Sequence, residues 1–139
     1  MKEIGLLNSE IADVMARLGH MDEVIACDAG FPIPLRVRTV DIALAVNQPT
    51  VLEVLHVLLQ GFSVEKIVLA DETRTHSPSM FARLTDLFGP AVEVETIPHT
   101  ALKQRSRNVK AIIRTGDFTA YNNVLLVSGS GGRWYVETP

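Results

Sequence analysis

Three places in the chain combine side chains that can transfer protons or accept hydrogen bonds, and each lies at the end of an apolar segment. In the first, His20 follows a stretch of helical periodicity, and Asp28 follows the apolar run 24–27. The negative end of a helix dipole favours a nearby cation, and a histidine poised near neutral pH can both donate and accept a proton. Asp28 could accept hydrogen bonds from a hydroxyl-rich ligand. The alternative is that His20 only caps the helix and that Asp28 only begins a turn.

The second place brings Asp71, Glu72 and His76 together directly after the apolar run 66–70. Carboxylates and imidazoles are common metal ligands, but this spacing matches no standard metal site. We therefore expect a solvated loop with helix capping here, and no metal.

The third place combines His99, which follows the alternating segment 92–97, with Tyr121, Asn122 and Asn123, which precede the last apolar run. Histidine, tyrosine and amide side chains together suit a polyhydroxylated ligand. Taken singly, each of them is more often a surface or turn residue, so both interpretations stay open at this point.

The composition of the 139-residue chain narrows the classes of protein to which it can belong. It has 13 Lys and Arg against 16 Asp and Glu, a net charge of −3 and a mean hydropathy of +0.19, as in an ordinary globular domain. The slightly acidic balance argues against nucleic acid as a partner. No apolar run approaches the ~18 residues of a membrane span, and acidic residues interrupt the N-terminal segment where a signal peptide is apolar. The single cysteine, Cys27, cannot form an internal disulfide, so we expect a cytoplasmic protein.

Helical and extended patterns alternate along the chain, which favours a layered α/β domain. Open α/β sheets bind ligands beyond the carboxyl ends of their strands, so the three polar places lie where a site is expected. Residues 37–45 have an ambiguous extended pattern. The helix that starts at Pro49 is apolar on much of its circumference, so we expect it to be buried on more than one side. The expected helices begin at N-cap Ser9, at Pro49, at N-cap Ser77 and near Thr100, and the expected strands cover 24–27, 66–70, 92–97, 111–113 and 124–127.

Several segments, taken in order, resemble the D-ribose pyranase family. The most specific are Leu18-Gly19-His20 and the segment Cys27-Asp28-Ala29-Gly30-Phe31-Pro32-Ile33-Pro34. The similarity is collinear from about residue 5 to residue 129. Further matching segments are Leu7-Asn8-Ser9, Val40-Asp41-Ile42-Ala43-Leu44, Glu72 with His76-Ser77-Pro78, Pro98-His99, Ile113-Arg114-Thr115-Gly116 and Tyr121-Asn122-Asn123-Val124-Leu125-Leu126.

The resemblance implies an enzyme that interconverts the pyranose and furanose forms of D-ribose without a cofactor. It implies one domain over residues 1–139, a three-layer sandwich with helices on both faces of a mixed six-stranded sheet, and a ring-like homo-oligomer, typically a decamer. The family's general-acid histidine matches His20, and a family lysine matches Lys103. The family's sugar-binding residues match Asp28, His99, Tyr121, Asn122 and Asn123. Because family pockets are completed across a subunit boundary, we expect the segment 121–123 of one subunit to complete the His20 and Asp28 pocket of another.

Three departures from the family pattern bear on these expectations. Asp117 stands where the family usually has glutamate, Asn122 replaces a small residue, and residues 130–139 form a divergent C-terminal tail in place of a short apolar end. Two other functions stay open. One is mutarotation of L-fucose or another monosaccharide, in which anomers exchange without a change of ring size. The other is a non-catalytic sugar-binding regulatory subunit, although the presence of both His20 and His99 favours an enzyme, because binding alone needs no acid.

Overall fold

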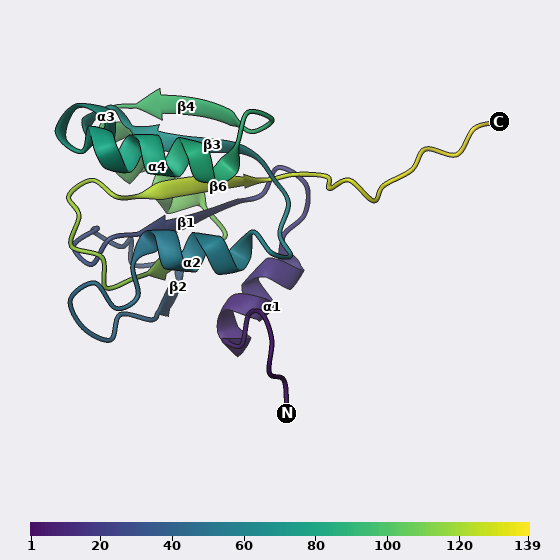
Figure 1. Ribbon diagram of the computed structural model, residues 1–139, viewed down its shortest axis with the longest axis horizontal. Coiled ribbons are helices and arrows are strands. Elements are labelled where there is room, and N and C mark those ends of the chain that lie inside the picture. The colour runs from purple at the N-terminus through teal and green to yellow at the C-terminus, as the bar shows by residue number, and fades with distance from the viewer.

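The computed structural model describes residues 1–139, which fold around one six-stranded sheet (Figure 1). Its strands are β1 (Glu23–Cys27), β2 (Arg38–Asp41), β3 (Val64–Ala70), β4 (Glu93–Ile97), β5 (Ala111–Arg114) and β6 (Val124–Ser128). The strand order is β2-β5-β1-β6-β3-β4. β6 pairs antiparallel with both β1 and β3, while the remaining pairings are parallel. The mixed six-stranded sheet implied by the resemblance is therefore confirmed.

Local capping explains where two of the helices begin. The Asn8 side chain accepts a hydrogen bond from the Ile11 amide at 2.9 Å, so Asn8 is the N-cap of the first helix and the prediction of Ser9 is wrong by one residue. Thr50 and Glu53 form a reciprocal capping box at the start of the second. No helix has the length and apolarity needed to cross a membrane. The helices are α1 (Ser9–Arg17), α2 (Val51–Leu58), α3 (Asp71–His76), α4 (Pro78–Phe88) and α5 (His99–Arg105), followed by a 3-10 turn at Ser106–Asn108.

Helices cover both faces of the sheet, because successive side chains of the strands point to opposite faces. On one face, Val24 and Ala26 of β1 belong to a buried cluster that includes residues of α1, α2 and α4. On the other face, Ile25 and Cys27 pack in a second cluster with Leu102 of α5. The three-layer sandwich implied by the resemblance is thus confirmed, and β1 is buried from both sides.

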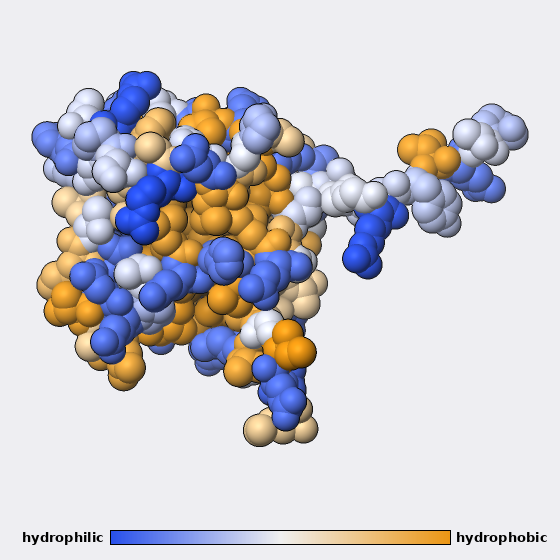
Figure 2. All heavy atoms as spheres, in the orientation of Figure 1, coloured by the Kyte–Doolittle hydropathy of each residue, from blue (hydrophilic) through white to orange (hydrophobic).

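α2 is less enclosed than its sequence predicted. Val51, Val54, Leu55 and Leu58 are buried against the sheet. Its remaining apolar residues are half-buried, and apolar surface is visible between α2 and α4 in Figure 2. The prediction that this helix is buried on more than one side is therefore wrong for the single chain, and an apolar surface stays open to solvent.

The segment after β3 is helical, where we expected a loop. Acidic residues in the first turn of α3 and basic residues in its last turn complement the helix dipole, so a charged segment can form this short helix. Ser77 precedes α4 as predicted, but its hydroxyl donates to the Ala120 carbonyl at 3.3 Å and makes no capping bond. β2 lies inside the segment 37–45, which was ambiguous from the sequence.

Five strands run in one direction, so their carboxyl ends meet at the same edge of the sheet, which we call the carboxyl edge. Asp28 follows β1 there, α3 follows β3, and His99 follows β4. Residues 121–123 also lie there, because they precede the oppositely directed β6. His20 precedes β1 and lies at the opposite amino edge, from which the C-terminal tail also departs (Figure 1).

Candidate functional site

Asp28 and Asn123 are joined at the carboxyl edge because β1 and β6 are neighbours in the sheet. The Asp28 amide donates to Asn123 Oδ1 at 2.9 Å, and Asn123 Nδ2 donates to Asp28 Oδ2 at 3.1 Å. The other carboxylate oxygen accepts from the Gly30 amide at 3.0 Å. Burial raises the pKa of Asp28, and the hydrogen bonds from Gly30 and Asn123 oppose this rise. Asp28 is thus a partly buried carboxylate held in one fixed orientation.

His99 lies beside Tyr121, with ring centroids 5.1 Å apart and the ring planes at 86°. The buried Phe31 approaches the His99 ring edge-on at 6.0 Å. Burial lowers the pKa of His99, the positive charge of Lys103 lowers it further, and the carboxylates of Glu72 and Asp28 partly oppose this. The Nδ1 atom of His99 is buried without a hydrogen-bond partner. The lowered pKa favours the neutral form of the ring, which is able to accept a proton.

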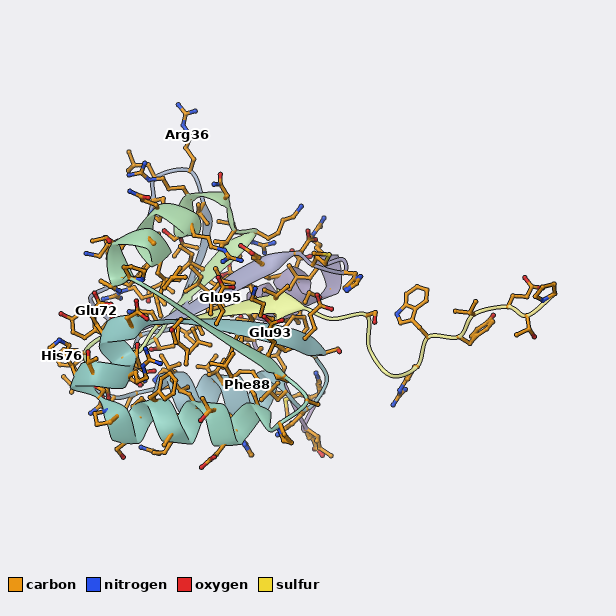
Figure 3. The ribbon with its side chains drawn as sticks, turned by 90° about the horizontal axis from the view of Figure 1, so that it is seen from above. Arg36, Glu72, His76, Phe88, Glu93 and Glu95 are labelled. Atoms are coloured by element: carbon orange, nitrogen blue, oxygen red, sulfur yellow. The ribbon has the colours of Figure 1, made fainter.

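The side chains of Glu72 and His76 in α3 contact this site, although the sequence suggested only a solvated loop there. The Glu72 carboxylate accepts a hydrogen bond from the His99 amide at 2.8 Å. The His76 ring stacks on Tyr121, with centroids 5.4 Å apart and ring planes 26° apart. Figure 3 shows both side chains on α3 at one end of the molecule. Asp71, Glu72 and His76 do not form a group that could hold a metal ion. Their place directly after a buried strand was the signal that could have linked them to the site.

Asn122 lies behind the site and does not reach its surface. Its side chain is fully buried, and Nδ2 donates to Asp117 Oδ2 at 2.9 Å. Asp117 is also buried and accepts from the amides of Val51 and Thr119 at 2.9 and 2.7 Å. The expectation that the Asn122 side chain binds substrate is therefore corrected, because this side chain anchors the loop to the start of α2.

His20 is separated from the rest of the candidate site within one chain. It lies before β1, whereas Asp28 lies after it, and five extended residues span roughly 16 Å. His20 Nε2 is 2.7 Å from Glu65 Oε2, and about half of the His20 side chain is exposed. We expected His20 and Asp28 to share one subunit's part of the pocket, with residues 121–123 supplied by another. The structure instead groups Asp28 with residues 121–123 and leaves His20 alone.

The candidate site is open to solvent on this chain. A hollow of about 370 Å³ borders Asp28, between Arg114 and the loop 117–120. Arg114 forms one wall, because its guanidinium donates to the Ala29 carbonyl and pairs with Asp41 at 3.0 Å. Large exposed apolar side chains occupy the surrounding loops, which follow β1, β2 and β5. They are Leu35, Leu44, Val46 and Phe118. Of these, Phe118 lines the hollow itself, and exposed apolar side chains beside a polar site are typical of a surface that another molecule covers.

Comparisons with known proteins identify the family to which this chain belongs. Residues 1–130 match the RbsD / FucU transport protein family. A D-ribose pyranase of Thermotoga neapolitana is 43% identical over 132 residues, which cover 93% of this chain and 98% of the relative. The structure of Bacillus subtilis RbsD complexed with D-ribose superposes with a TM-score of 0.89 at 36% identity, covering 94% of this chain and 99% of the other. A fucose mutarotase of Streptococcus pneumoniae in complex with L-fucose shares the fold, with a TM-score of 0.70 at 16% identity, covering 90% of this chain and 94% of the other. The chain therefore belongs to the RbsD / FucU family.

Proposed function

We propose that this chain is a D-ribose pyranase, an isomerase that interconverts the pyranose and furanose forms of D-ribose. The observation that carries the proposal is the cluster of Asp28, His99 and Tyr121 at one sheet edge. The chain that carries this cluster superposes closely on a relative whose structure contains D-ribose. Relatives more than 40% identical over almost their whole length are D-ribose pyranases.

The chemistry requires no more than acids, bases and hydrogen bonds. The anomeric hydroxyl loses its proton, the bond between the anomeric carbon and the ring oxygen breaks, and the ring oxygen gains a proton. The open-chain aldehyde then rotates, and a different hydroxyl attacks the carbonyl carbon while the protons move in the reverse direction. General acid–base catalysis contributes about 10²- to 10⁴-fold to such steps.

Each candidate residue has a role that fits its surroundings. His99, neutral because burial lowers its pKa, accepts the proton of the anomeric hydroxyl. The fixed carboxylate of Asp28 accepts hydrogen bonds from sugar hydroxyls, and Tyr121 contributes its ring and hydroxyl to the same surface. Asn123, whose side chain is buried like that of Asn122, orients Asp28 through two hydrogen bonds, and its direct contact with the sugar would need a change in this packing. His20 of a second subunit donates the proton to the ring oxygen, with its ring oriented by Glu65.

The separation of His20 from the other residues determines the kind of oligomer that this mechanism needs. A second copy must place its amino edge against the carboxyl edge of the first, so the two copies use different surfaces. A contact of this type repeats around a closed ring or along an open filament. Met21, which is exposed beside His20, and the apolar rim at the carboxyl edge supply surfaces for this contact. A ring-like homo-oligomer, a decamer in particular, and a cytoplasmic location belong to this proposal.

NMR saturation transfer between the pyranose and furanose signals of D-ribose tests the function. We expect faster exchange with the protein than without it, and unchanged exchange after exhaustive chelation of metal ions. His20→Ala should largely abolish the exchange while leaving the fold and the oligomer intact. Exchange of L-fucose anomers without ribose ring exchange would identify a fucose mutarotase. Binding of ribose with no exchange of either sugar would identify a non-catalytic subunit.

A further inference from the structure

The backbone at Tyr121 has a conformation that tyrosine rarely adopts. Its φ angle is 61°, in the left-handed region, where the Cβ atom of a non-glycine residue is crowded by the backbone. A bulky residue stays in this region only where its surroundings hold it there. The contacts that hold Tyr121 therefore determine where its ring lies.

α3 holds the backbone of this turn from one side. The Thr73 hydroxyl donates to the Tyr121 carbonyl at 2.7 Å, and Thr73 is fully buried. The same carbonyl also accepts from the Asn123 amide at 2.9 Å. Ser77, which directly follows α3, donates its hydroxyl to the carbonyl of Ala120 at 3.3 Å. Two consecutive carbonyls of the turn are thus bonded to hydroxyl groups at or next to α3.

The same helix also contacts the side chains that face the carboxyl edge. The His76 ring stacks on the Tyr121 ring, and the Glu72 carboxylate accepts from the His99 amide. The His99 ring in turn meets Tyr121 edge-on. Every residue of α3 with a contact to the site acts on Tyr121 or His99, the two aromatic members of the candidate site.

We propose that α3 is a positioning element of the site and that Thr73 is its central positioning residue. Its hydroxyl fixes the left-handed turn at Tyr121, so that the tyrosine ring is held ready for the sugar before binding. The identity of the sugar rests on the proposed function, whereas the positioning of Tyr121 does not. Loss of the Thr73 hydroxyl should weaken sugar binding, because part of the binding free energy is then needed to order the turn.

The test compares Thr73→Val with Thr73→Ser in the ribose exchange assay. Valine keeps the shape of threonine but lacks the hydroxyl, and we expect the KM for ribose to rise about fivefold, the factor that corresponds to one typical hydrogen bond. A smaller fraction of folded protein would lower kcat without changing KM. Thr73→Ser should restore KM to within about twofold of wild type, because it keeps the hydroxyl. Thr75→Val is the matched control, since the Thr75 hydroxyl lies only near carbonyls of its own helix, at 3.4 Å.

A second readout does not depend on the reaction. The chain has two tyrosines, so ¹³C-labelled tyrosine gives separate NMR signals for Tyr121 and for the exposed Tyr135. Thr73→Val should shift the Tyr121 signals, whereas Thr75→Val should not, and Tyr135 should stay unchanged in both. If Thr73→Val does not fold, His76→Ala replaces it, because His76 is exposed and its removal takes away the ring stacked on Tyr121.

Unchanged Tyr121 signals together with an unchanged KM in a folded variant would overturn the positioning role. Shifted Tyr121 signals in a protein whose wild type exchanges neither sugar would support the positioning of Tyr121 and refute the proposed function. The two proposals therefore fail in distinguishable ways.

Discussion

Two variants that are each inactive should restore activity when they assemble in the same ring. His20→Ala removes the proposed proton donor at the amino edge, and Tyr121→Ala removes a proposed sugar-binding residue at the carboxyl edge. A complete site needs an intact amino edge from one copy and an intact carboxyl edge from its neighbour. Each variant alone lacks one of these at every site, so each homo-oligomer should be inactive.

The arrangement of the two edges predicts how much activity returns. A working site needs His20 from a Tyr121→Ala copy and Tyr121 from a His20→Ala copy. In a random one-to-one mixture, half of the copies retain His20 and the other half retain Tyr121. Each site takes one residue from each of two neighbouring copies, so about a quarter of the sites should contain both. The exchange rate per subunit should therefore return to about a quarter of the wild-type value, with the wild-type KM.

The measurement is ribose exchange by NMR on coexpressed variants, after copurification through two different tags has confirmed that they assemble together. The control pair is Asp28→Asn with Tyr121→Ala. Both residues lie at the carboxyl edge of one chain, so every copy carries a defective carboxyl edge and no activity should return. Mixed oligomers of the first pair that stay inactive would refute the shared site, and recovery by the control pair would refute the grouping of Asp28 with Tyr121.

Three further variants test the contacts at the carboxyl edge and the packing of the tail. Asn123→Ala removes two hydrogen bonds to Asp28, so the free energy of unfolding in urea should fall by about 2–3 kcal/mol. In the same variant the pKa of Asp28, measured by carboxyl NMR titration, should rise further, because one of the bonds that lower it is lost. Lys103→Met should raise the pKa of His99, because a positive charge that lowers this pKa is removed. If His99 is the base and reacts in its neutral form, the acid limb of the kcat/KM profile should move to higher pH. An unmoved acid limb in a variant whose His99 titration has shifted would show that His99 is not the base. Deletion of residues 131–139 should change the free energy of unfolding by less than about 0.5 kcal/mol, because these residues are exposed, and a larger loss would show that the tail packs on the domain.

The central strands of the sheet could be predicted from the sequence because they are buried on both faces. Runs such as 24–27 and 124–127 have no polar position, and their lengths and boundaries identify central strands. Cys27 lies in one of these runs, and its burial raises the pKa of its thiol to about 12. The family resemblance implied only a mixed six-stranded sheet. The strand order and the antiparallel direction of β6 came from the structure, because local patterns do not specify which strands pair.

Three features of the site were not predicted from the sequence: the helix α3, the position of His20 and the pairing of Asp28 with Asn123. α3 has no apolar periodicity, and its stability comes from end charges and from its contact with the 120–121 turn, neither of which a local pattern contains. The error about His20 could have been avoided, because a residue before a strand and a residue after it must lie at opposite edges. The pairing of Asp28 with Asn123 joins residues 95 positions apart and required the three-dimensional structure.

Asp117 and Asn122, two of the departures from the family pattern, are in direct contact, so their effects must be considered together. A change from glutamate to aspartate at position 117 shortens the carboxylate by one methylene, and Asn122 brings an amide that donates to it at 2.9 Å. Asp117 still binds the first amide of α2, so the loop remains joined to the helix. The arrangement has a cost, since Asn122 Oδ1 is buried without a partner. Because Asn122 lies between Tyr121 and Asn123, this bond holds both of them in place. The two positions therefore act together in supporting the candidate site from behind.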